Sequence, residues 1–463
     1  MPLIDLNIVQ IVNRKLNGEV KICCFPRTLR EVLSEGRRNS EIVRSWSLYT
    51  SSNRQLAYIF DDKDTSYNGG IHGLDSDIVS QHDGYPISIM VFDSREGPDP
   101  GEDIGKFLLN GIRSGRFLDL VVLDLKGIFR PHLPSTIGRL KRLKFLGLRW
   151  TYLEILPSSI CKLLHLQTLD LKYTNLFTLP FSIWKLMKLQ HLHLNRNCRI
   201  KFMPQPNAIS MENLQVLSGV FVDHEGIALT NRLHKLSNLR RLELTFQLTK
   251  PQQEVLATCI RQLTHLNSLR LRSLSETAVP QDLILDNCLK ELTKLSRLHL
   301  MGKLELESLI ELPESLSELR LSASRLSGSV NSLLGKLSTL PKLESLSFFG
   351  DSYCEPEMVF PKGFSKLLVL KIWKLDNLRK LVVEEEAMQK LREFEIRSCG
   401  VLEHTIGLTH LKTLQELKLT NMPAAHAAAI EKEFTAAYKE QYADNVSLRL
   451  IKINNGQFSA QFS

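Results

Sequence analysis

The chain has 463 residues, of which 43% are hydrophobic and 24% are charged, and it carries a formal net charge of +9 at pH 7. This length exceeds the size at which one globular core normally stops growing, about 250 to 300 residues, so a single compact core is excluded unless a structural unit repeats along the chain. The positive charge would suit nucleic-acid binding, but the basic residues are scattered among acids without a recognised reader motif, and we expect no nucleic-acid partner.

The eight cysteines contain no Cys-x-x-Cys pair and no framework of closely spaced loops. The amino terminus lacks the pattern of a secretory signal, and no apolar run approaches the roughly 18 residues that a membrane-spanning helix needs. We therefore expect free thiols, no membrane span and a reducing, cytoplasmic location.

Residues 1–40 differ from the rest of the chain. They predict a short helix, a turn at Asn17-Gly18 that closes a hairpin, a strand over Val20–Cys24 and a second helix from Thr28 to about Ser34. Such a segment is too short to bury a core of its own. We expect it to be the end of a small helical domain that begins upstream.

Residues 41–116 predict degenerate first repeats. Two imperfect strand phrases occur here, with large apolar residues at Val43, Trp46 and Leu48 in the first and at Ile87, Met90 and Phe92 in the second. Between them, residues 61–84 are rich in Asp, Ser, Gly and Asn and cannot bury enough apolar surface to offset their ordering entropy. We expect a mobile loop there, and a second loop at residues 94–105, which contain Pro98 and Pro100.

Residues 117–423 repeat a six-residue phrase in which the first, fourth and sixth residues are large and apolar. The phrase begins at Leu120, Leu143, Leu166, Leu189, Leu214, Leu239, Leu266, Leu295, Leu316, Leu343, Leu367, Leu391 and Leu414. The first four starts are 23 residues apart and the later spacings drift between 21 and 29, within the range of a leucine-rich repeat. The pattern predicts an α/β solenoid, an irregular leucine-rich-repeat horseshoe with parallel strands on its concave face.

Three early coils add a second signature after the strand phrase. Each has Leu-Pro-x-x-Ile, at residues 133–137, 156–160 and 179–183, with the isoleucine expected to point inward. Cys399 lies at the turn after its strand phrase, where Asn, Cys or Thr commonly bond the backbone of the next coil, so we expect a structural role for it.

Residues 424–463 predict a carboxyl-terminal cap. The stretch Ala424 to Tyr442 is rich in Ala, Glu and Lys and favours a helix. A last strand phrase follows with Leu448, Ile451 and Ile453 as its apolar residues. A terminal coil needs a polar outer face, which this helix and strand would supply.

The variable residues of each strand phrase alternate with the apolar ones, so they should face the open side of the coils. Those of the middle coils are basic and those further along include two aromatics, and together they form the candidate partner-binding surface: Arg241, Arg270, Arg272, Arg297, His299, Arg320, Phe349 and Trp373. Arginine and tryptophan are common among residues that dominate protein interfaces, so this surface suits an acidic patch on a protein ligand. Two alternatives are a solvated face whose charges cancel against Glu243 and Glu318, and aromatics that pack under a neighbouring loop.

The sequence offers no residues for an enzymatic function. It contains no phosphate-binding loop, no His-Glu-x-x-His element and no nucleophile elbow, so we expect no catalytic residues and no cofactor. His191 and His193 lie on one strand face, but two ligands without a third rarely hold a metal, and we expect none.

The segments LPSTIGRLKRLKFLGL and LPSSICKLLHLQTLDL, together with the uneven later coils, resemble plant intracellular immune receptors of the coiled-coil, nucleotide-binding, leucine-rich-repeat class. The segment NGEVKICCFPRTLREVL resembles the end of that family's winged-helix subdomain, so residues 1–40 would be a winged-helix remnant. Pro26 and Arg27 stand where the family usually has His-Asp, so a histidine contact to nucleotide phosphate is not carried over, and the nucleotide-binding module is absent.

The resemblance implies the sensing and autoinhibitory module of a disease resistance protein. Such a module binds a pathogen effector or a guarded host protein and, in a full-length receptor, also holds the nucleotide-binding module of the same receptor inactive. Alternatives are a stand-alone adaptor or decoy that does not signal, and a substrate-recruiting ubiquitin-ligase subunit, for which residues 1–40 lack the adaptor-binding helical motif.

Overall fold

The computed structural model describes most of the repeat region and parts of both ends. The described residues are 10–14, 20–24, 45–47, 55–60, 86–93, 97, 99–195, 211–223, 233–285, 288–309, 311–328, 330–441 and 449–453. The chain divides into two compact units, one of residues 1–10 and 24–245 and one of residues 11–23 and 246–463.

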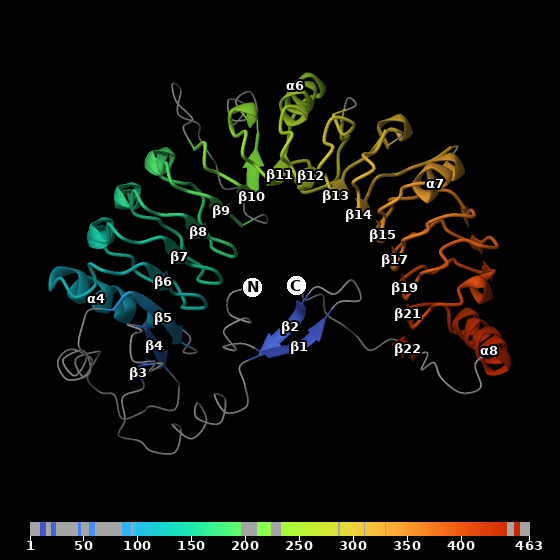
Figure 1. Ribbon diagram of the computed structural model, residues 1–463, viewed down its shortest axis with the longest axis horizontal. Helices are drawn as coiled ribbons and strands as arrows, with labels where there is room; N and C mark the ends of the chain where they lie inside the picture. Colours follow the sequence, from blue (N-terminus) through green and yellow to red (C-terminus); the bar gives the residue numbers. More distant parts are fainter. Residues whose placement is uncertain are drawn as a thin grey trace, which may run out of the picture. The chain divides into compact units, whose positions relative to one another are not determined.

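In the first unit each coil contributes one short strand to a sheet (Figure 1). Its strands are β3 (Ser45–Ser47), β4 (Gln55–Phe60), β5 (Ser88–Asp93), β6 (Val122–Asp124), β7 (Phe145–Gly147), β8 (Thr168–Asp170), β9 (His191–His193), β10 (Val216–Val222) and β11 (Arg241–Phe246). From β4 to β10 each strand pairs in parallel with the next, while β3 pairs antiparallel with β4.

The second unit continues the same construction. Its main-sheet strands are β12 (Ser268–Ser273), β13 (Arg297–Met301), β14 (Glu318–Ser322), β15 (Ser345–Phe349), β17 (Val369–Trp373), β19 (Glu393–Arg397), β21 (Glu416–Thr420) and β22 (Arg449–Ile453), all parallel to their neighbours. A second parallel sheet is formed by β16 (Glu357–Phe360), β18 (Lys380–Val383) and β20 (His404–Ile406).

Stacked leucines explain this architecture. Leu146 pairs in register with Leu169, and Leu169 with Leu192, and all three side chains are fully buried. Each coil thus buries its apolar residues against the coils before and after it, which is how a solenoid builds a continuous core. The predicted fold class is confirmed, and each of the thirteen phrases contains a strand.

One phrase departs from the predicted pattern. The sixth position of the phrase at Leu214 is occupied by Gly219, which has a φ of 79°. Strand β10 continues to Val222, and Val220 and Phe221 are buried beyond the glycine. Glycine accepts this left-handed conformation without the steric penalty that a side chain would bring.

The segments that close each coil on the side away from the strands are helical or extended. They include the helices α4 (Asp99–Arg113), α6 (Lys250–Arg261), α7 (Val330–Ser338) and α8 (Ala424–Gln441), and the 3-10 turns η2 (Ser135–Arg139), η3 (Ser158–Lys162), η4 (Phe181–Lys185), η5 (Leu233–Lys235), η6 (Leu306–Leu309) and η7 (Leu408–His410). The Leu-Pro-x-x-Ile signature produces η2, η3 and η4, each starting just after its proline. Ile137, Ile160 and Ile183 are buried, as predicted.

Two predictions for the amino-terminal part are wrong. The predicted strand at Val20–Cys24 is present as β2, but Gln10–Arg14, where a short helix was expected, forms strand β1 of the same two-stranded sheet. Residues 99–105 of the expected second loop belong to α4, because a proline in the first turn of a helix removes only a donor that would be unpaired anyway. Residues 61–84 and the expected helix at 28–34 lie outside the described residues.

The predicted registers of the first and last strands are off by one residue. Ile89 pairs with Leu123 and is buried, whereas Met90, which was expected to point inward, is exposed. At the other end α8 forms as predicted, but Leu450 pairs with Leu417, and Lys452 occupies the position expected for an apolar residue. In both strands apolar residues occur in either register, and a slip of one residue turns every side chain over.

Cys161, Cys259, Cys288, Cys354 and Cys399 are all free thiols. The Cys399 thiol is buried and lies 3.9 Å from the carbonyl oxygen of Ile372 in the preceding coil. It therefore contacts the coil before it instead of the next one.

Candidate protein-binding surface

The strand register of the second unit brings most of the predicted surface residues together. Arg270 pairs with His299 and His299 with Arg320, while Arg272 pairs with Met301. Arg297 lies opposite Glu318. Five of the eight predicted residues therefore lie on three consecutive strands, β12, β13 and β14.

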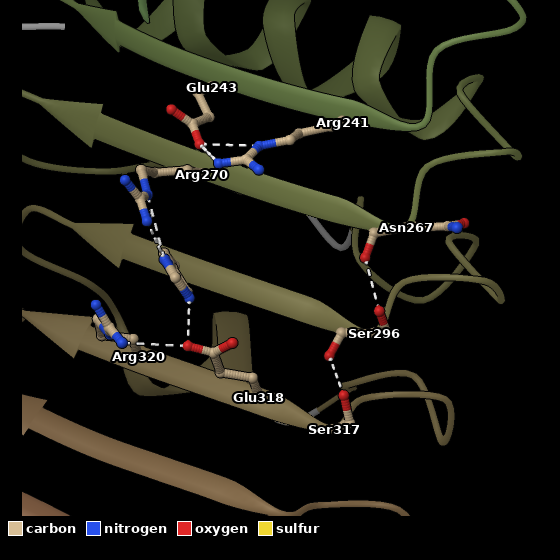
Figure 2. Close-up of polar contacts among 9 residues, drawn as sticks. Arg241, Glu243, Asn267, Arg270, Ser296, Ser317, Glu318 and Arg320 are labelled. Atoms are coloured by element: carbon tan, nitrogen blue, oxygen red, sulfur yellow. Dashed lines mark hydrogen bonds and ion pairs between the residues drawn. The ribbon is translucent and has the colours of Figure 1, made fainter. Parts of the chain in front are cut away.

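A chain of polar contacts joins these strands (Figure 2). Nε and Nη2 of Arg270 lie 3.2 and 2.7 Å from Nδ1 of His299. On its other side, Nε2 of His299 lies 2.9 Å from Oε1 of Glu318, and Nη2 of Arg320 donates to the same oxygen over 3.2 Å. Because Arg270 can only donate, Nδ1 must be an acceptor, so His299 is neutral with its proton on Nε2.

The direction of the pKa shift of His299 agrees with a neutral imidazole. Burial lowers the pKa of His299, although the hydrogen bond to Glu318 opposes that effect. Burial by itself would raise the pKa of Glu318, but the hydrogen bond from His299 and the nearby positive charges lower it to about 2. Glu318 is therefore ionised at neutral pH and anchors both side chains.

Serine hydroxyls fix the same coils at the beginning of their strands. The hydroxyl of Ser296 donates to the carbonyl oxygen of Asn267 and that of Ser317 to the carbonyl oxygen of Ser296, both over 3.0 Å (Figure 2). These bonds add to the backbone pairing that sets the register of the row formed by Arg270, Arg272, Arg297 and Arg320.

The two predicted aromatic residues form a tilted pair of rings flanked by arginines. The Phe349 and Trp373 rings lie 4.5 Å apart, with the guanidinium of Arg320 5.2 Å from the first ring and that of Arg397 5.4 Å from the second. Cation–aromatic contacts of this kind order long side chains that would otherwise be free. Both rings are half-buried.

Sequence reasoning missed an ionic network on the last coils. Nζ of Lys371 lies 3.1 Å from Glu393 and 3.3 Å from Glu395, and Nζ of Lys418 lies 3.4 Å from Glu393 and 2.8 Å from Glu416. The signal was available, because lysines and glutamates occupy matching phrase positions in successive coils.

Arg241, the eighth predicted residue, belongs to the first unit. Its Nε lies 3.0 Å from Oε1 of Glu243, and its Nη2 contacts the same oxygen. The predicted cancellation by Glu243 is therefore real at this position. Arg241 and Glu243 form a local ion pair on β11.

His191 contacts a hydroxyl of the preceding coil, and His193 contacts a hydroxyl of the next coil. Nδ1 of His191 lies 3.1 Å from Oγ1 of Thr168, and Nδ1 of His193 lies 2.9 Å from Oγ of Ser218. In the described part of the chain no group of three or more His, Cys, Asp or Glu side chains is placed to hold a metal ion.

Parallel strands with stacked leucines define a leucine-rich-repeat solenoid, a class of protein that offers an extended strand face for binding. Residues 110–446 match the family described as leucine-rich repeat region, and the chain belongs to that family. It is therefore a leucine-rich-repeat domain of the protein-interaction type.

Two solved bacterial structures are similar to the chain. The leucine-rich-repeat protein LIC12759 of Leptospira interrogans superposes with a TM-score of 0.49 and 20% identity, covering 86% of this chain and 96% of its own. The functional domain of InlJ from Listeria monocytogenes, which includes a cysteine ladder, gives a TM-score of 0.39 and 14% identity, covering 73% and 63%. No curated protein sequence matches the chain. Among the described residues, no helix is both long and apolar enough to cross a membrane.

Proposed function

We propose that the strand face of the second unit binds a protein partner through an acidic patch on that partner. The supporting observation is the row of Arg270, Arg272, Arg297 and Arg320 on three paired strands, whose face holds one carboxylate, Glu318. These arginines are partly buried, and three of them contact other side chains of the same strands, so less side-chain entropy is lost when a partner binds.

The chemistry of the row selects the partner. Arginine presents a planar fork of donors that matches carboxylates, and each charge-assisted hydrogen bond is stronger than a neutral one. The tilted pair of Phe349 and Trp373 extends the row with half-buried aromatic surface. Such aromatic and arginine residues at the centre of a face are typical of interface hot spots.

We further propose that this domain is the sensing and autoinhibitory module of a plant disease resistance protein, located in the cytoplasm and without enzymatic activity. The support is the Leu-Pro-x-x-Ile repeat resemblance, and the ligand would be a pathogen effector or a guarded host protein. In a full-length receptor the same domain would also contact the nucleotide-binding module. The alternative is a stand-alone adaptor or decoy without signalling activity, which an in-frame phosphate-loop sequence upstream of Met1 would exclude.

The test is a charge reversal at the row. A two-hybrid matrix against secreted effectors of plant pathogens and their host targets would supply an interacting protein, which is then titrated with purified chain. The variant with Arg270→Glu, Arg297→Glu and Arg320→Glu should weaken binding by about a hundredfold or more, since removing hot-spot charges costs several kcal/mol. Circular dichroism and the melting midpoint should stay close to those of the wild type.

A matched control carries the same charge change elsewhere in the same unit. Lys294, Lys336 and Lys342 are exposed and lie outside the strand face, so their replacement by Glu should change binding by no more than about threefold, the size of a rim effect. Should the arginine variant lose its fold, the same three arginines replaced by Gln would separate stability from binding. Unchanged affinity in the arginine variants would rule out the row as the binding site.

A further inference from the structure

The turn that follows each strand imposes a left-handed backbone on one residue. This residue stands two places after the last apolar residue of the strand phrase, and its φ is positive in many coils: Gly127 (86°), Trp150 (62°), Tyr173 (59°), Ala323 (49°), Gly350 (38°), Lys374 (54°), Ser398 (55°) and Asn421 (52°). The cause is a backbone hydrogen bond to the next coil, as from Trp150 N to Lys172 O over 3.0 Å.

Glycine and asparagine suit this position, and bulky residues do not. A side chain in the left-handed region crowds its own backbone, so an aromatic residue there carries a conformational cost that glycine avoids. Gly127 satisfies the same turn in the coil before Trp150. The backbone therefore gives no reason for Trp150 and Tyr173, and residues held in such conformations cluster at functional sites.

The two aromatic side chains form a flat, accessible platform. Their rings are stacked 3.7 Å apart at 8° to each other. Trp150 is 41% exposed, and the neighbouring Tyr152, whose φ is also positive at 52°, is 45% exposed. Tyr152 in turn lies against Phe129, with ring centroids 5.8 Å apart.

Buried threonines make the platform rigid. The hydroxyl of Thr151 donates to the carbonyl oxygen of Leu148, and that of Thr174 to the carbonyl oxygen of Leu171, each over 2.8 Å. Both threonines are fully buried. The turns beneath the rings are thus fixed before any partner arrives, which reduces the entropy lost on binding.

The same two coils also carry two strongly exposed apolar side chains and a lysine. Ile155 and Phe177, in the same two coils, are 78% and 74% exposed. Arg149 is paired with Asp170 over 3.1 Å, whereas Lys172, next to Tyr173, lies in no ion pair with any described residue. Burial and the positive charge of Arg149 lower the pKa of Lys172, while the carboxylates of Glu243 and Asp170 oppose that shift.

We propose that Trp150, Tyr152 and Tyr173 form a second docking site, for a protein segment that carries a large apolar side chain next to a carboxylate. The apolar group packs on the ring platform and the carboxylate pairs with Lys172. This inference rests on the proposed protein-recognition role, but it uses residues of the first unit and none of the arginine row.

The test uses peptides as the probe. A phage library of random peptides is panned against the whole chain, and enriched peptides are titrated against the wild type and the variant with Trp150→Gly and Tyr173→Gly. Because glycine already serves this turn in the preceding coil, the variant should keep its melting midpoint within about 3 °C. Its affinity for the enriched peptides should fall by at least about tenfold, as for truncated hot-spot aromatics.

Two further variants sharpen the result. Lys172→Gln should lower the affinity for peptides that contain an acidic residue by about three- to tenfold. It should leave the affinity unchanged for the same peptides with that acidic residue replaced by Ala. Leu164→Ala, at an exposed leucine, is the matched control and should bind like the wild type.

The outcomes are distinguishable from failure of the proposed arginine site. Loss of peptide binding in the glycine variant but not in the triple arginine variant supports the platform. A drop of more than about 10 °C in the melting midpoint of the glycine variant would show that the rings serve stability instead. Two results would overturn the proposal: enriched peptides that lack an acidic residue next to a large apolar one, or equal affinity of the peptides for the wild type and the glycine variant.

Discussion

His193 shows how the strand face controls the charge of a single residue. Burial, followed by the positive charge of Lys172, lowers the pKa of His193 to about 4, while Asp170 opposes that shift and His191 and Arg241 add to it. The unfolded chain takes up this proton near the ordinary pKa of about 6.5. The stability that neutral His193 supports is therefore complete above about pH 6.5 and is lost as the pH falls from there toward 4.

A substitution isolates this contribution. His193→Gln removes the titrating group while leaving an amide that can bond Ser218, so the variant should lose less free energy of unfolding than the wild type between pH 7 and pH 5. Urea unfolding at both pH values measures the difference. His165→Gln, at an exposed histidine, is the control and should behave like the wild type. Equal pH dependence in all three chains would contradict the assignment.

The sequence predicts which side chains of each strand point away from the core, because variable and apolar residues alternate with a period of two along the strand. It does not predict their partners. The contact of Arg270 with His299 spans 29 residues and that of His299 with Glu318 spans 19. These separations depend on the irregular length of each coil, so the charge pairing and the neutral state of His299 require the register that only the folded chain provides.

Helix α4 packs closely against the segment from Phe129 to His132, because glycines without a Cβ occupy the contact. Gly101 lies in its first turn, and a Cβ there would be 2.2 Å from the carbonyl oxygen of Arg130 and 2.7 Å from that of Phe129. Alanine favours a helix over glycine by about 1 kcal/mol. The clash with backbone atoms should nevertheless dominate, and we predict that Gly101→Ala destabilises the fold by about 1 to 3 kcal/mol.

The control lies on the exposed face of the same helix. Asn110→Ala changes an exposed position, so it should leave stability unchanged or raise it by up to about 0.5 kcal/mol. Urea denaturation of both variants compares the two. A stability gain in Gly101→Ala similar to that of Asn110→Ala would mean that the helix moves away from the coil beneath it.

The sequence failed to predict α4 because its prolines and glycines resemble a loop when each is taken alone. In the folded chain Pro100 starts the helix, and Gly101 and Gly105 allow close packing against the segment from Phe129 to His132. Tertiary packing thus overrode local propensity. The one-residue slip of β5 has a related cause, since Ile89 and Met90 are adjacent apolar residues and only the pairing of Ile89 with Leu123 on β6 selects between them.

At the scale of the whole molecule, the leucine period was sufficient to predict the solenoid and the position of thirteen strands. It could not predict the second sheet of β16, β18 and β20, because the segments that close those coils have no repeated sequence signal. In these coils Met358, Phe360 and Leu381 supply the buried contacts instead. The outer segments are therefore free to vary while the strand side keeps its spacing.

A solenoid of this kind should respond locally to damage in its core. Leu298 on β13 is fully buried between β12 and β14, so Leu298→Ala should cost about 2 to 5 kcal/mol. Because each coil contacts only its neighbours, amide hydrogen exchange should accelerate most in β12, β13 and β14 and least in β6, β7 and β8. Hydrogen-exchange mass spectrometry measures this gradient, with Leu164→Ala as the exposed control. A uniform acceleration across all strands would instead show that the two units unfold as one cooperative body.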